Sequence, residues 1–115
     1  LTLCLGPAGR FAVRAEWRTT TSAAGPGRAR PLTPDTGAFW FFAGDNLELM
    51  VKVLDGCVVN GHWWVFAGGL TDVATRIEVT DRLTGVRREW TSPVGSPFAP
   101  LQDTLAFACE PPPSS

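Results

Sequence analysis

The sequence predicts an all-β domain, an antiparallel β-sandwich of about eight strands, and three observations lead to this prediction. Apolar and polar residues alternate along most of the chain, as in strands with one buried and one solvated face. The 12 Gly and 10 Pro residues fall between these segments, where they mark turns. The apolar segments recur every ~8–12 residues, which is the spacing of strands in a sandwich.

The first half of the chain contains four expected strands or strand pieces. Phe11–Trp17 alternates apolar residues with Arg and Glu, and a Gly/Pro/Ser/Thr-rich loop is expected at Thr19–Arg30. A short strand is expected at Ala29–Thr33, ended by the Pro-Asp-Thr-Gly turn at 34–37. Ala38–Ala43 is apolar on both faces, which is typical of a central strand. The segment Leu1–Leu5 is an uncharged strand at the beginning of the chain.

The second half continues the alternation. Asp55-Gly56 favours a tight turn, and Asn60-Gly61 is the strongest type I′ hairpin signal in the chain. No helix is expected, because the β-branched residues and the strict alternation favour strands. The expected strands of this half are Leu47–Leu54, Cys57–Val59, His62–Ala67, Val73–Asp81, Val86–Thr91 and Thr104–Cys109.

These elements predict a sandwich that is Ig-like in the broad sense, with a small closed barrel as the alternative. The expected core residues are Phe11, Val13, Trp17, Leu49, Val51, Val53, Val65, Ile77 and Val79. Residues 1–109 form one domain in this interpretation, and residues 110–115 form a Pro/Ser-rich linker or tail.

The charge balance excludes several classes of partner. Ten basic and eleven acidic residues give a net charge of −1, so we expect no nucleic-acid partner and no anionic membrane surface. The longest run without charged or strongly polar residues is Trp63–Leu70, far below the ~18 residues that span a bilayer. The chain opens with Leu1-Thr2-Leu3-Cys4, without an initiator Met, so a mature or excised fragment is expected.

Three widely spaced cysteines predict a disulfide in an oxidising compartment. Cys4, Cys57 and Cys109 contain no CxxC pair, and His62 is the only histidine, so a zinc site is not expected. The stiff Pro-rich tail favours an extracellular protein over a cytosolic one with buried thiols. We predict a Cys4–Cys57 disulfide, with Cys109 free or paired outside this chain. A Cys4–Cys109 disulfide and three free thiols are the alternatives.

Several segments together resemble an uncharacterised domain of large secreted bacterial proteins. The resemblance covers nearly the whole chain, and its most specific part is the VKVLDGC…WVFAGGLTDV pattern. It implies secretion and an accessory role, often in several copies or beside other extracellular domains, and it supplies no catalytic residues. The segments that carry it are Gly9–Val13, Asp35–Phe42, Leu47–Cys57, Trp64–Val73 and Val79–Gly85.

The sequence lacks the residue patterns of an enzyme. His62 is the only His, and beside the Asn60-Gly61 turn it is interpreted as a hairpin-edge residue rather than a catalytic base. No GxGxxG, P-loop or HExxH pattern occurs. Asp residues recur at expected turns without the DxDxDG spacing of a calcium loop, so neither a metal nor a cofactor is predicted.

The aromatic residues are the main functional candidates. The chain has five Trp and seven Phe, and the adjacent Trp63 and Trp64 must point to opposite faces of a strand. Trp40, Trp63 and Trp64 therefore form a possible contact surface, whose members serve as core, as an interface, or as a platform for sugar rings.

Two functions follow from these residues. The first is a non-enzymatic extracellular structural or adhesive module that contacts other copies or neighbouring domains. Leu1, Leu3 and Leu5 would then form an edge strand that completes a sheet in the same or a neighbouring copy. The second is a carbohydrate-binding accessory module, which coplanar exposed rings flanked by Asn, Gln or Asp would favour.

Overall fold

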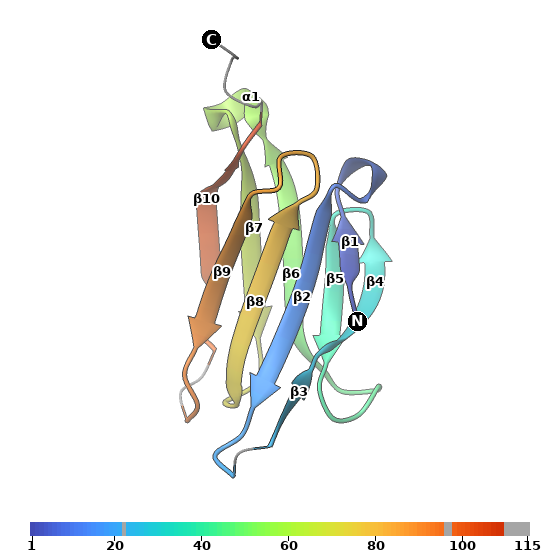
Figure 1. The fold of residues 1–115 in the computed structure, drawn as a ribbon, viewed down its shortest axis with the longest axis vertical. Coiled ribbons are helices and arrows are strands. Elements are labelled where there is room, and N and C mark those ends of the chain that lie inside the picture. The colour runs from blue at the N-terminus through green and yellow to red at the C-terminus, as the bar shows by residue number, and fades with distance from the viewer. Residues whose placement is uncertain (22, 96–97, 110–115) are drawn as a thin grey trace.

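The computed structural model describes residues 1–21, 23–95 and 98–109. Two antiparallel sheets of five strands each stack face to face and form an elongated sandwich (Figure 1). This confirms the predicted all-β sandwich, while the Ig-like subclass stays a prediction. The predicted tail at 110–115 lies outside the described residues.

The first sheet, called sheet A, contains the N-terminal strand. Its path runs β1-β2-β8-β9, and β3 pairs with β2 beyond the end of β1 (Figure 1). A short 3-10 helix, η1 (Pro7–Gly9), joins β1 to β2. The strands are β1 (Leu3–Leu5), β2 (Phe11–Arg18), β3 (Ala24–Pro26), β8 (Ala74–Asp81) and β9 (Arg87–Ser92).

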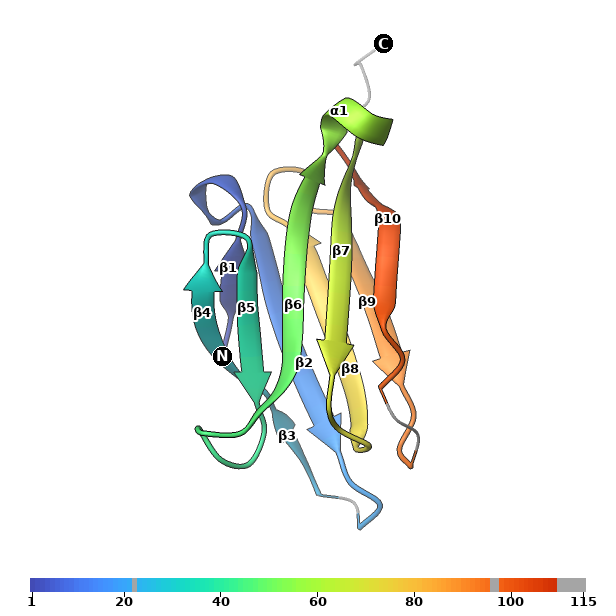
Figure 2. The ribbon, with the colours of Figure 1, turned by 180° about the vertical axis from the view of Figure 1, so that it is seen from behind.

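The second sheet, called sheet B, contains the strands that are richest in aromatic residues. Its order is β10-β7-β6-β5-β4, and Figure 2 shows it from behind. A single helical turn, α1 (Cys57–Asn60), connects β6 to β7. The strands are β4 (Arg28–Thr33), β5 (Thr36–Trp40), β6 (Leu47–Gly56), β7 (His62–Gly69) and β10 (Leu101–Ala108).

The core lies between the inner faces of the two sheets, as the alternation predicts. Of the nine predicted core residues, eight are buried, and Trp17 is half-buried beside Phe42 with ring centroids 4.7 Å apart. Trp17 lies near the open end of the sandwich, where fewer neighbours cover it. The buried eight are Phe11, Val13, Leu49, Val51, Val53, Val65, Ile77 and Val79.

Half of the predicted loop at Thr19–Arg30 is strand, because β3 and the first three residues of β4 lie within it. Only Gly27 separates β3 from β4, so the chain crosses there from sheet A to sheet B. The Gly27 N–H donates to the Ala15 carbonyl at 2.7 Å. A Cβ on Gly27 would lie 3.2 Å from both the Ala15 Cβ and the Phe41 ring, so glycine permits this close crossing. The glycines and prolines that predict a loop here belong to a bend between two sheets.

The predicted strand at Cys57–Val59 is wrong, because these residues form the helical turn α1. Gly61 adopts a left-handed conformation with φ of 73°, and its N–H donates to the Cys57 carbonyl at 3.0 Å. A glycine after Asn suits both a type I′ turn and the end of a helical turn. The Asn-Gly pair therefore predicts the left-handed residue correctly but does not distinguish the two turns.

The predicted Cys4–Cys57 disulfide is wrong, and so is the Cys4–Cys109 alternative. The disulfide joins Cys57 to Cys109, with 5.8 Å between their Cα atoms. Cys4 is free and exposed, since it points outward from β1 in sheet A, whereas Cys57 follows β6 in sheet B. The Cys109 N–H donates to the Gly61 carbonyl at 3.0 Å, so the end of β10 is hydrogen-bonded beside α1.

The N-terminal strand completes a sheet of its own chain, and this corrects part of the predicted edge-strand surface. Leu3 and Leu5 are fully buried, whereas Leu1 is 61% exposed. A Cβ on Gly37 would lie 2.2 Å from the Leu3 side chain, so β5 leaves room for Leu3 at this point. Leu3 and Leu5 are therefore core residues and are not free to contact another copy.

Within the described ranges, none of the helices is long and apolar enough to cross a membrane.

We predict that Leu3→Ala destabilises the fold without changing its association. Removing a buried Leu side chain leaves a cavity and costs about 2–5 kcal/mol. Urea unfolding measures this loss, and Leu1→Ala is the matched control with an expected change below about 0.5 kcal/mol. Equal stability of the two variants, together with a change of oligomeric state in Leu3→Ala, would contradict the assignment of β1 to the core.

A second prediction concerns the disulfide. Cys57 and Cys109 are 52 residues apart, and closing such a loop stabilises the fold by up to about 4 kcal/mol in the chain-entropy model. Cys57→Ala with Cys109→Ala therefore lowers the free energy of unfolding, and Cys4→Ala leaves it nearly unchanged. Peptide mapping without reduction is expected to recover Cys4 as the alkylated thiol, and recovery of a Cys4-containing disulfide would refute the pairing.

Candidate functional site

The outer faces of the two sheets differ in chemistry. On sheet A, basic and acidic residues alternate across β2, β8 and β9. The Arg76 guanidinium is paired with Glu16 at 3.2 Å, with Glu78 at 3.3 Å and with Glu89. The bond from Arg76 is the main cause that lowers the pKa of Glu89. The three Glu residues of this face are paired with Arg76, while Arg14 and Arg18 of β2 form no ion pair within 4.0 Å among the described residues.

The outer face of sheet B is apolar and aromatic. Val51, Val53 and Val65 are buried on the inner side, so their neighbours along β6 and β7 point outward. Lys52 lies directly across from Phe66 in the register of the two strands. We call this outer surface the aromatic face, and its residues are Trp40, Met50, Lys52, Leu54, Trp64 and Phe66.

Trp64 is held in a fixed position on this face. Its indole N–H donates to the Asn60 side-chain oxygen at 2.9 Å, and the Asn60 amide donates to the Thr104 carbonyl at 2.8 Å. The ring lies close over Gly56, where an added Cβ would be 2.1 Å from the indole nitrogen. Because its only hydrogen-bond donor is used, the half-buried ring offers a partner apolar surface.

The rings of the aromatic face are not coplanar. Trp64 and Phe66 meet edge-on, with centroids 6.1 Å apart and an angle of 61° between their planes. Trp40 lies on β5, and the Arg28 guanidinium lies 5.5 Å from its ring centroid. The face is therefore an uneven apolar surface rather than a row of flat platforms.

Of the three predicted contact residues, the structure places Trp40 and Trp64 on the aromatic face and Trp63 in the core. As predicted, Trp63 and Trp64 point to opposite faces of β7. The Trp63 side chain is 6% exposed, and its ring lies 5.0 Å from that of Phe11. Half-buried Trp40 and Trp64 are the members available to a partner.

Sequence reasoning missed Met50, Lys52, Leu54 and Phe66 as parts of the same surface. The signal was present in the alternation: Met50 and Leu54 are apolar residues on the side of β6 that should be wet, and His62–Ala67 is apolar on both faces. What the sequence did not provide was the register that places these residues side by side.

An ion pair closes the sandwich beside Trp63. Arg10 donates two hydrogen bonds of 2.8 Å to the Asp81 carboxylate, which is 1% exposed, and its guanidinium lies 5.5 Å from the Trp63 ring. Burial alone would raise the pKa of Asp81, but the hydrogen bonds from Arg10, Leu83 and Thr84 outweigh it and lower the pKa. This ion pair is a structural feature of the fold, because the charges of Arg10 and Asp81 are paired with each other.

The two edge strands of sheet B have features that oppose pairing with another sheet. β4 contains Pro31, which has no N–H to donate. β10, at the opposite edge, has an irregularity between Asp103 and Phe107 that breaks its register with β7. These features oppose assembly through the edges of sheet B and favour contact through its outer face.

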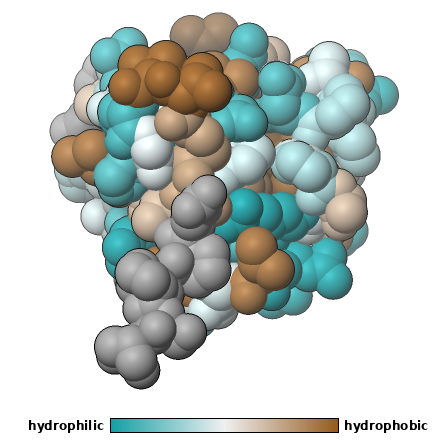
Figure 3. Space-filling view, turned by 90° about the horizontal axis from the view of Figure 1, so that it is seen from above, coloured by the Kyte–Doolittle hydropathy of each residue, from teal (hydrophilic) through white to brown (hydrophobic). Residues whose placement is uncertain are grey.

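The tip of the sandwich carries a rigid apolar turn. Val58 and Val59 in α1 are 99% and 70% exposed, and Leu105 in β10 is 65% exposed. Figure 3 views this end and shows separate apolar patches among hydrophilic residues. Asn60 links α1 to Trp64 through the hydrogen bond described above, so the tip is adjacent to the aromatic face.

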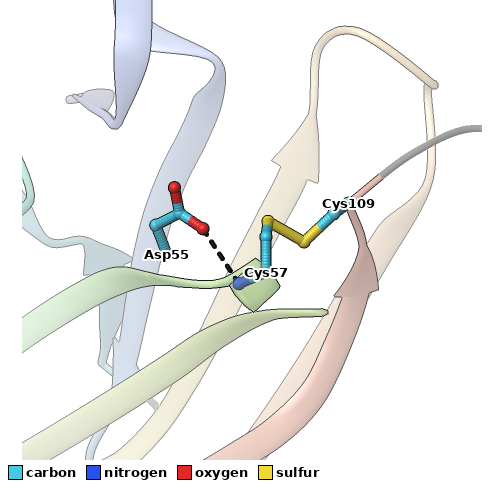
Figure 4. Close-up of side chains that lie close together, drawn as sticks. All are labelled: Asp55, Cys57 and Cys109. Carbon is cyan, nitrogen blue, oxygen red and sulfur yellow. Dashed lines mark hydrogen bonds between the residues drawn. A yellow bond between two sulfur atoms is a disulfide. The ribbon is translucent and has the colours of Figure 1, made fainter. Parts of the chain in front are cut away.

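Asp55, Cys57 and Cys109 lie together below this tip, with potential ligand atoms within 4.8 Å of one another (Figure 4). The two sulfur atoms are bonded to each other, and an Asp55 oxygen accepts a hydrogen bond from the Cys57 N–H at 2.9 Å. Neither sulfur is a thiolate in this arrangement, and metals bind the thiolate form. The cluster is therefore a covalent and hydrogen-bonded cap for the turn.

A cavity of about 540 Å³ lies at the far end of sheet A. Small residues such as Ala24 and Ala74 line it, together with Glu16 and Arg76, which are paired with each other. His62, the predicted hairpin-edge residue, does not line this cavity. It lies beside α1, with its Nδ1 2.9 Å from the Asn60 carbonyl oxygen. Neither place brings a nucleophile next to a free base.

Comparison of the chain with known protein families, with curated proteins and with solved structures finds no match. The geometry of the described residues is therefore the basis for the functional argument, and the resemblance to domains of secreted bacterial proteins stays a prediction.

We predict that Gly56→Ala displaces Trp64. The added methyl group would overlap the indole ring and also approach the His62 carbonyl oxygen, at 2.7 Å. We expect a loss of about 1–3 kcal/mol in stability and a red-shifted Trp emission as the ring leaves the sheet. Gly68→Ala is the control, because a Cβ there meets nothing within 4 Å. An unchanged emission spectrum in Gly56→Ala would refute the proposed seat for Trp64.

Proposed function

We propose that this chain is a non-enzymatic extracellular module that contacts other protein domains, and that the aromatic face is its contact surface. The observation that carries the proposal is the difference between the two outer faces. Sheet A presents paired charges, which suit water, whereas sheet B presents Trp, Phe, Met and Leu side chains. Apolar patches of this kind on a protein surface are typical of interaction sites.

The size and shape of the aromatic face favour a protein partner. Five strands spaced ~4.8 Å apart, with strands of 8–10 residues at its centre, give a face of roughly 20 by 30 Å. That area is of the same order as the ~800 Å² that each partner buries in a standard interface. The edge-on Trp64–Phe66 pair suits interdigitating side chains better than sugar rings, which stack on coplanar aromatic faces.

Three further features support an extracellular, non-catalytic role. The Cys57–Cys109 disulfide is typical of proteins from oxidising compartments. The resemblance of the sequence to secreted bacterial domains points the same way. His62 faces a backbone carbonyl, and the Glu residues on the outer face of sheet A are paired with Arg76, which favours binding over acid–base chemistry.

Hydroxyl-radical footprinting tests this proposal with a natural reporter. Met50 is the only methionine, lies on the aromatic face and is 44% exposed. We expect Met50 and Trp64 to be oxidised more slowly, by about fivefold or more, in the protein isolated from its native source than in the purified 115-residue chain, because a partner excludes water from the interface core.

Leu83 is the internal control, since it is 68% exposed and lies in the turn between β8 and β9. Its oxidation rate should be the same in both samples. Equal oxidation of Met50 and Trp64 in the two samples would contradict a contact at this face.

A further inference from the structure

The charges around the aromatic face carry an inference that rests on the proposed function and specifies the partner. Arg28 and Arg30 of β4 lie across from Trp40 and Ala38, so they point outward on the same side as Lys52. All three side chains are exposed. Among the described residues, the ion pairs within 4.0 Å involve Arg10, Arg76 and Arg87 and none of these three cations.

Two of the carboxylates beside this face are hydrogen-bonded or buried. Asp35, in the turn before β5, accepts hydrogen bonds of 2.8 Å from the Thr33 and Thr36 hydroxyls, which lower its pKa, and the charge of Lys52 also helps to lower it. Glu48 at the start of β6 is 9% exposed, and burial raises the pKa of its carboxyl group. Exposed Asp45 lies in the loop between β5 and β6, so the three cations of the face outnumber Asp35 and Asp45, the two carboxylates beside it that are not buried.

The positive charge also argues against two copies pairing through this face. In such a pair, the cations of one aromatic face would meet those of the other, and like charges across an interface are repulsive. The acidic residues on the outer face of sheet A lie on the opposite side of the sandwich and do not reduce this local excess. The aromatic face therefore favours a partner surface of negative charge over a second copy of itself.

We infer that the aromatic face docks an acidic protein surface, with Arg28 and Arg30 at its β4 edge and Lys52 among its apolar residues contacting carboxylates. The two arginines follow the usual anatomy of an interface, in which charges lie at the rim of an apolar and aromatic centre, whereas Lys52 lies within that centre beside Phe66. The cation of Arg28 is also held over the Trp40 ring, at 5.5 Å, so part of this charge is pre-positioned. Arg30 donates to the Gly44 carbonyl at 3.3 Å and is likewise positioned locally.

Binding of the 115-residue chain to model polyanions tests the inference. The probes are poly-L-glutamate, polygalacturonate and neutral dextran, measured by calorimetry at low salt. The test variant replaces Arg28, Arg30 and Lys52 with Gln. The matched control replaces Arg14, Arg18 and Arg87 with Gln on the outer face of sheet A, so both variants lose the same net charge.

We expect poly-L-glutamate to bind, and the sheet B triple variant to weaken this binding by about tenfold or more, against less than threefold for the control. Replacing Trp64 and Phe66 with Ser should also weaken it, because the apolar centre is lost. Thermal melting of each variant verifies that the fold is intact.

Other outcomes overturn the inference in distinguishable ways. Tighter binding of polygalacturonate than of poly-L-glutamate would assign the face to an acidic polysaccharide. Equal losses in the two triple variants, or no binding of poly-L-glutamate, would refute an acidic partner while leaving the footprint at Met50 as the separate test of contact. If Met50 is unprotected in the native protein, the proposed function itself fails.

Discussion

The packing of two inner sheet faces against each other is the constraint on which the other features of this fold depend. Each sheet has one apolar face that must be removed from water, and stacking them buries aliphatic residues such as Val13, Val51 and Val79 completely. The N-terminal strand must pair with β2 to complete this cover, which is why Leu3 seats against Gly37. Once the apolar residues of both inner faces are buried, core packing does not constrain the residues of the outer faces, so the two outer faces can differ in chemistry.

The two outer faces use that freedom differently. Sheet A has the interleaved Arg and Glu residues of a solvated surface, which contribute little to stability individually. Sheet B has rings that are only half-buried and three exposed cations that form no ion pair within 4.0 Å in the part of the chain that the structure describes. Exposed apolar area does not stabilise the isolated fold, and Pro31 in β4 and the irregularity of β10 disfavour strand addition at the edges of sheet B. A partner on the aromatic face accounts for both observations.

Much of this architecture could be predicted from the sequence, because an alternating pattern determines which side of a strand is buried. The alternating pattern placed eight of the nine named core residues correctly and assigned Trp63 and Trp64 to opposite faces of their strand. The disulfide and the crossing at Gly27 were not predictable in the same way, and for β1 the sequence left open whether it completes a sheet of its own chain or of a neighbouring copy. They depend on which strands become neighbours, and strand order is a long-range property that local pattern does not contain. The aromatic face was found only in part for the same reason, since Phe66, Lys52 and Met50 become one surface through register.

The central claim is that the aromatic rings on the outer face of sheet B serve contact with a partner rather than folding. The most direct test is the free energy of unfolding of a variant in which two of these rings are replaced by polar residues. Trp64→Ser with Phe66→Thr removes the two outward-facing rings of β7 and leaves Trp63, on the inner face, in place. The account predicts a loss within about 2 kcal/mol, because half-exposed rings gain only part of the burial free energy. A loss above about 6 kcal/mol, which is the cost of removing two core aromatics, would show that these rings hold the fold together and would contradict the account.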